Sequence, residues 1–268
     1  MGNVDALARV VDVYAWQRAN VETRVALQVR RTLMRFAGWY SPEQVAQMAD
    51  VIGVQVAAGQ RSVAGLTDTY MARMAREVFG ESFAAVGVPA WMGNTLRLNV
   101  SGHVEVYSRL GVEFRRQMAA DGDASGALSA TLSRADAMVS TDLGLAARDQ
   151  SSRFMERRGV QRYRRVIRPE VSKSGTCGLC LVAADRVYRR SSLLPLHARC
   201  KCVVVAVTDA DPGKSLNAGS LSAVYSAVGS TSADALKRTR VQVVQHSELG
   251  PQLRVADQNF RGPDQLAA

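Results

Sequence analysis

All four cysteines of this 268-residue chain fall within 26 residues, and this stretch constrains the fold more than any other feature of the sequence. Cys177 and Cys180 form a Cys-x2-Cys pair. After 16 further residues, His197 opens a His-x2-Cys-x-Cys run that contains Cys200 and Cys202. Such a concentration of thiols in one short segment indicates that they act together.

The apolar run at residues 203–207 after the second pair is strand-like. Side chains alternate along a strand, so Cys200 and Cys202 are expected on the same face. The two cysteine pairs could then converge on one tetrahedral centre. The sequence therefore predicts a structural zinc site held by Cys177, Cys180, Cys200 and either Cys202 or His197.

Other uses of these cysteines stay open. They could form disulfides or a cluster of reduced thiols, of which the reduced state is favoured because disulfide frameworks are typical of short secreted chains. A redox Cys-x2-Cys is disfavoured because no thioredoxin-like βαβ pattern surrounds it. A catalytic zinc is disfavoured as well, because four protein ligands close the coordination shell and no Glu lies nearby as a general base.

The net charge of +10 is concentrated in one part of the chain. Residues 153–201 hold 13 basic and 3 acidic residues, whereas the rest of the chain holds 21 of each. A concentrated basic surface favours a polyanionic partner, nucleic acid first. A solvated basic face, or pairing with acidic groups of a partner protein, explains the charge equally well. The candidate contact residues are Arg157, Arg158, Arg162, Arg164, Arg165 and Arg168.

The first 159 residues read as a helical region, because apolar residues recur at three- and four-residue steps. Ser41 and Pro42 have the residue types of an N-cap and a first helical position. Gly59 is expected to break the helix that starts there. The predicted helices cover residues 4–38, 42–58, 61–79, 91–119 and 125–158, with a polar turn at 121–123.

Residues 160–208 read as a small antiparallel β module pinned by the cysteines, with strands at 163–168, 186–188 and 201–207. Alternation along the first strand predicts Arg162 and Arg164 on one face and Arg165 on the other. So short a module buries too little apolar surface to hold its shape unaided, and a metal would supply the missing stability. Residues 209–268 read as a linker and an extended tail, with a short strand at 241–244. The predicted fold class is α+β.

The sequence offers no catalytic constellation and no membrane segment. His103, His197 and His246 lie far apart in the chain, and no Ser/His/Asp set or carboxylate pair stands out. The chain has no apolar run of 18 residues, and its first residues lack the basic region of a secretory signal. We expect a non-catalytic protein that does not enter a membrane.

The cysteine segment resembles the phage Mu F-type minor head proteins, and most of all their actinobacteriophage branch. The resemblance rests on Cys-x2-Cys followed by His197-x2-Cys200-x-Cys202 and an apolar strand, after a long helical region. Tyr163-Arg-Arg-Val-Ile-Arg168 and His246-Ser-Glu-Leu-Gly-Pro251 also look like that branch. The part that carries these motifs covers roughly residues 150–208.

This resemblance implies a minor capsid, or head morphogenesis, protein of a tailed phage. Such a virion protein is present in few copies inside the capsid near the portal vertex, and in the host cytoplasm during assembly. The implied partners are portal protein, major capsid protein and phage DNA. Two alternatives stay open: a zinc-dependent nucleic-acid-binding protein, which no recognition-helix pattern supports, and a His-metal nuclease, for which the cysteine segment supplies one histidine.

Overall fold

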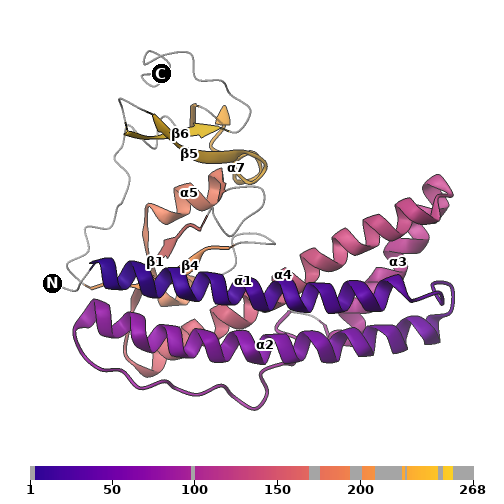
Figure 1. The fold of residues 1–268 in the computed structure, drawn as a ribbon, viewed down its shortest axis with the longest axis horizontal. Helices are drawn as coiled ribbons and strands as arrows, with labels where there is room; N and C mark the ends of the chain where they lie inside the picture. Colours follow the sequence, from indigo (N-terminus) through magenta and orange to yellow (C-terminus); the bar gives the residue numbers. More distant parts are fainter. Residues whose placement is uncertain are drawn as a thin grey trace.

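The computed structural model describes residues 4–97, 100–168, 176–193, 201–208, 225–226, 228–246 and 250–255. For residues 4, 176, 177, 192, 240–246 and 250–255 it describes the backbone alone. Long helices make up most of this part of the chain, and small antiparallel sheets follow them (Figure 1). The predicted α+β class is confirmed.

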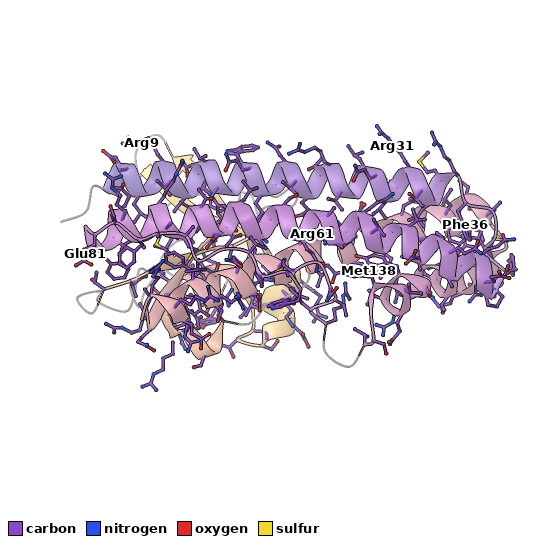
Figure 2. The ribbon with its side chains drawn as sticks, turned by 90° about the horizontal axis from the view of Figure 1, so that it is seen from below. Arg9, Arg31, Phe36, Arg61, Glu81 and Met138 are labelled. Carbon is purple, nitrogen blue, oxygen red and sulfur yellow. The ribbon has the colours of Figure 1, made fainter. Side chains whose placement is uncertain are left out.

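Two helical hairpins form the N-terminal region. α1 (Val4–Met34) and α2 (Pro42–Phe79) lie side by side along most of their length (Figures 1 and 2). α3 (His103–Asp121) and α4 (Ala124–Arg157) are joined by the predicted polar turn and pack against α2. All four helices contribute to one hydrophobic core in this region.

α2 begins as predicted, but the predicted break at Gly59 is wrong. The Ser41 hydroxyl accepts a hydrogen bond from the Gln44 amide at 3.3 Å, as an N-cap does. The helix then runs through Gly59 without interruption. A Cβ on Gly59 would lie 2.7 Å from Cγ2 of Val25, so the missing side chain lets α1 and α2 approach closely. This packing outweighs the helix-propensity cost of glycine, about 1 kcal/mol.

The prediction of helix is also wrong for residues 91–97 and 100–102, since α3 starts at His103. Residues 91–97 form turns, and Gly93 has a φ of 108°, which a helix does not allow. The turns carry Arg97 to α4, where its Nε donates to Oδ1 of Asp142 at 2.6 Å. A partly buried ion pair thus holds this segment against α4, and helix propensity alone does not reveal that contact.

β1 (Arg162–Val166), β3 (Val187–Arg189) and β4 (Val203–Ala206) form an antiparallel sheet in the order β3-β1-β4. These three strands overlap the predicted ones. Tyr163 and Arg165 of β1 are buried, whereas its other residues are half-buried, so the predicted alternation is confirmed.

This sheet shares a hydrophobic core with the helices. Every residue of β4 is buried, in one cluster with Tyr14 of α1, Met74 of α2 and Phe154 of α4. The Tyr70 hydroxyl of α2 donates to the carbonyl oxygen of Val204 at 2.7 Å. Residues on both sides of the predicted boundary at residue 159 therefore contribute to one hydrophobic core.

Part of the predicted linker and tail is folded. α7 (Ala233–Arg238) leads into a hairpin of β5 (Arg240–His246) and β6 (Gly250–Val255). β5 also pairs with β2 (Thr176–Cys177), the strand that ends at the first cysteine. The predicted strand at 241–244 is confirmed as part of β5, and α7 and β6 are elements that the prediction of a linker and tail does not include. Residues 256–268 lie outside the part that the structure describes.

Candidate metal centre and basic face

The structure brings two of the five predicted zinc ligands together. Cys180 lies in α5 (Gly178–Ala184), and Cys202 directly precedes β4. Both are buried, and they form one cluster with Ile167 and Leu179. The cluster lies at the end of the β3-β1-β4 sheet where β1 ends and β4 begins. Residues that are 22 positions apart in the chain thus meet through the packing of α5 on β1.

The other three predicted ligands fall where the structure gives no side chain. Cys177 is described by its backbone, as the last residue of β2, and α5 begins at the next residue. His197 and Cys200 lie outside the described residues. Among the side chains that are described, no three His, Cys, Asp or Glu residues are grouped to hold a metal ion.

The residues that are present fit a thiophilic metal such as zinc. Two buried thiols face a common apolar cluster, and thiolate sulfur is a preferred zinc ligand. Cys177 stands at the junction of β2 and α5, three positions before Cys180, so the Cys-x2-Cys pair spans a strand end and a first helical turn. Zinc bound there would supply a tetrahedral cross-link and no reaction of its own.

The chain around Cys202 is fastened to α1. Arg18, which is 6% exposed, donates from Nη1 to the carbonyl oxygen of Cys202 at 3.4 Å. The neighbouring Lys201 forms an ion pair with Glu22, one helical turn further along α1. These contacts and the Tyr70 hydrogen bond to β4 position one side of the candidate centre on the helical region.

Several buried charged groups lie in the sheet and in the helices packed on it, and the sequence analysis missed most of them. Arg148 of α4 is buried, and both it and Arg18 lie beside Gly144, where a Cβ would be 3.0 Å and 3.5 Å from their guanidinium nitrogens. Arg165 and Asp185 are buried as well, at 3% and 1% exposure. A buried arginine on a largely polar helix has no distinctive sequence signal, because its burial depends on the neighbouring element.

Arg165 is therefore not a surface contact, and this part of the candidate set is corrected. Its guanidinium carbon lies 5.7 Å from the ring centroids of both Tyr163 and Tyr188, a cation–π arrangement. Burial raises the pKa of Tyr163, and the adjacent Arg165 opposes that rise. Arg165 fills the core side of β1, where a phosphate group in solution cannot reach it.

Two further candidates fasten the connection between α2 and α3. Arg157 donates to the carbonyl oxygen of Val86 at 2.8 Å, and Arg158 to that of Ala84 at 2.7 Å. The buried carboxylate of Asp68 accepts hydrogen bonds from amides of the same connection. Arg157 remains exposed beside this contact. These two arginines therefore stabilise the fold, besides any contact that they make with a partner.

The opposite face of the sheet carries a smaller basic group than the sequence indicates. Arg162 and Arg164 share the half-buried face of β1, and Arg189 pairs with Arg162 across the strands. Paired residues on antiparallel strands point to the same side, so the three arginines lie on one face, here called the basic face. Arg162 donates to the carbonyl oxygen of Thr208 at 3.2 Å. Arg168 forms an ion pair with Asp12 of α1 at 2.5 Å.

A buried polar network in the helical region was not predicted. Asp142, which is fully buried, accepts hydrogen bonds from Arg97 at 2.6 Å and from the Tyr107 hydroxyl at 2.7 Å. Burial and the adjacent Asp142 keep the pKa of Tyr107 well above its ordinary value, so the phenol stays a donor. His103 packs on Gly53, and burial lowers its pKa. Asp142, Arg97 and Tyr107 satisfy one another, which is typical of a structural network, whereas Nε2 of His103 is buried without a hydrogen-bond partner among the described residues.

Comparison of the chain with protein-family models, curated proteins and solved structures finds no match. In the described part of the chain, no helix combines the length and the apolar character needed to cross a membrane.

Proposed function

We propose that this chain is a minor capsid, or head morphogenesis, protein of a tailed phage. It is a non-catalytic structural protein of the virion, placed inside the capsid near the portal vertex. Its partners are portal protein, major capsid protein and, through the basic face, phage DNA. It supports head assembly and the packaging or delivery of the genome, and it resides in the host cytoplasm during assembly.

One observation carries this proposal: two of the motif cysteines, Cys180 and Cys202, pack together beside a sheet that shares its core with a long helical hairpin. Cys180 and Cys202 pack together on the β3-β1-β4 sheet, and that sheet buries β4 against α1, α2 and α4. The order of a helical region followed by Cys-x2-Cys and His-x2-Cys-x-Cys is the one that the resemblance to Mu F-type minor head proteins rests on. A rigid helical body with one cross-linked module suits a scaffold role.

The first test of this proposal is the location of the chain. Mass spectrometry of purified virions, together with a pulldown from infected lysate, is expected to find the chain with portal and capsid proteins. The same pulldown eluate, incubated with plasmid DNA and a divalent cation, is expected to leave the DNA intact. Cleavage of the plasmid that disappears in His197→Ala would instead establish the nuclease alternative.

The proposed metal is tested separately. We propose about one structural zinc per chain, bound by Cys177, Cys180, Cys200 and either Cys202 or His197. Elemental analysis of protein produced with zinc, alongside a free-thiol count, is expected to find stoichiometric zinc. Cys180→Ser is expected to lose it, whereas Ser152→Ala on half-buried α4 surface serves as a matched control that keeps it. Absence of zinc with disulfides formed under reducing conditions contradicts the metal site.

A further inference from the structure

α1 carries a stripe of exposed apolar side chains. Val13, Trp16, Leu27 and Met34 are all about half exposed or more, from 48% at Leu27 to 65% at Met34. At 3.6 residues per turn these four positions fall within about 60° of the helix circumference, over a length of about 32 Å. Single exposed apolar residues are common on protein surfaces, whereas a continuous exposed apolar surface marks an interaction site.

The stripe has the spacing of a helix–helix seam. Val13, Asn20, Leu27 and Met34 follow one another at intervals of seven residues, and Trp16 lies three positions after the first of them. A seven-residue repeat of this kind keeps one side of a helix against a partner helix along its whole length. Asn20 is exposed and occupies one of the seam positions, where a polar residue selects the register of the pair. The surface is therefore shaped for a helix.

The charges beside the stripe are basic. Arg9, Arg24 and Arg31 are exposed and lie within about 20° of the same arc, and Figure 2 shows Arg9 and Arg31 projecting away from α2. No carboxylate of the described residues pairs with any of the three. The carboxylates of α1 beyond its first turn are used in ion pairs with residues of the sheet segment. The apolar stripe and these three arginines are here called the outer face.

The combination of charge and shape selects one kind of occupant. A second copy of the chain would bring the arginines of two outer faces together, and like charges across an interface oppose binding. Nucleic acid accounts for the arginines but not for the apolar stripe, since phosphate contacts are made by polar and charged groups. A helix that enters a membrane surface presents a broader apolar side than this narrow stripe. A helix with acidic flanks satisfies both the stripe and the arginines.

We propose that the outer face of α1 docks an amphipathic helix of a partner protein, with an apolar stripe that repeats every seven residues and Asp or Glu on its flanks. Trp16 and Leu27 pack among the apolar side chains of that helix, and Arg24 and Arg31 pair with its carboxylates. Asn20 lies opposite a polar side chain and sets the register. This contact uses neither the cysteines nor the basic face, so it can fail or stand independently of the proposed function.

The test measures binding of the full chain to two labelled helical peptides of about four heptads, by fluorescence anisotropy. Both peptides carry Leu along the seam with one Asn, and their flanks carry Glu in one peptide and Lys in the other. The natural chain is expected to bind the Glu peptide at least about tenfold more tightly. Changing Arg24 and Arg31 to Glu should reverse this preference. The matched control changes Arg73 and Arg76, exposed on α2, to Glu and should keep it.

A second set of variants tests the apolar stripe. Changing Trp16 and Leu27 to Ser is expected to weaken binding of the Glu peptide by about thirtyfold or more. Val54→Ser, at an equally exposed position of α2, is expected to leave binding unaltered. Circular dichroism checks that each variant keeps its helices. Because the two sets of substitutions are independent, either set decides the question if a variant of the other unfolds.

Three results overturn the proposal. The first is that the natural chain binds neither peptide, or that reversing the charges of Arg24 and Arg31 leaves the peptide preference unchanged. The second is self-association in sedimentation that the Trp16 and Leu27 variant abolishes, since a second copy then covers the face. The third is binding to vesicles of phosphatidylcholine and phosphatidylserine that the same variant abolishes, without peptide binding, since the face then contacts a membrane surface.

Discussion

At the scale of single residues, Glu113 illustrates how a buried charge on α3 is stabilised. Its carboxylate accepts hydrogen bonds from Arg116 and Arg134 at 2.7 Å each and from Gln117 at 2.9 Å. These donors, Arg116 foremost, lower the pKa of Glu113 to about 2. The pair with Arg134 also ties α3 to α4, so this carboxylate stabilises the tertiary structure as well as one helix.

Glu113→Gln is expected to lower the free energy of unfolding by about 1–2 kcal/mol at pH 7, an amount reduced by solvent around the two exposed arginines. Because the pKa of Glu113 is lower in the folded state, its carboxylate stabilises the protein at pH values above the unfolded-state pKa. The difference between the two proteins should therefore be full at pH 7 and shrink as the pH falls from about 4.5 toward about 2. Urea denaturation at pH 7, 5 and 3 measures it. A difference that is constant over this range contradicts the role of the charge.

At the scale of elements, the sequence predicts well the features that depend on neighbouring residues, and it predicts poorly those that depend on tertiary packing. The start of α2 at Ser41, the turn at 121–123 and the strand β1 follow from short-range rules, and all three are confirmed. The prediction of a break at Gly59 is wrong because Val25 of another helix packs against this glycine. Residues 91–97 were misread because an ion pair with α4 fixes them.

The same reasoning limits what could be predicted of the candidate site. The cysteines share an unmistakable spacing, and the structure places Cys180 beside Cys202 as the spacing implies. Arg18 gives no such signal, since its approach to Cys202 depends on how α1 packs on β4. For Arg165 the sequence predicts only the face of the strand: alternation places it opposite Arg162. Its burial follows from the packing of the sheet on the helices, which the sequence does not reveal.

Gly59→Ala tests the packing reason for the uninterrupted α2. The added methyl group meets Val25 at 2.7 Å, so we expect a loss of about 1–3 kcal/mol in the free energy of unfolding. Gly65→Ala on the same helix is the matched control, because its Cβ would meet only Val88 Cγ2 at 4.0 Å. It is expected to stabilise the protein by up to about 1 kcal/mol through helix propensity. Equal effects of the two variants in thermal and urea denaturation would show that α1 does not constrain Gly59.

At the scale of the whole molecule, the helical region and the cysteine-bearing sheet act as one body. β4 is buried against three helices, and Lys201 and Arg168 form ion pairs with α1. Arg9 and Arg31 project from α1 on the side away from α2 (Figure 2).

The final prediction concerns which surface contacts DNA. If the basic face does, binding is insensitive to sequence and weakens steeply with salt, because each phosphate contact releases counterions. Changing Arg162, Arg164 and Arg189 to Gln should reduce the salt slope by up to about three units. The control changes the exposed Arg9, Arg24 and Arg31 of α1, which removes the same charge elsewhere and should leave the slope nearly unaltered.

Filter binding over a salt series, run beside an assay of incorporation into phage particles, separates the two uses of this face. A smaller slope in the sheet variant alone assigns the DNA contact to the basic face, because net charge is equal in the control. If both variants lower the slope equally, DNA senses overall charge and the assignment to the sheet is wrong. If the sheet variant binds DNA as the natural chain does but no longer enters particles, the face contacts a protein at the portal vertex, and the DNA role is rejected.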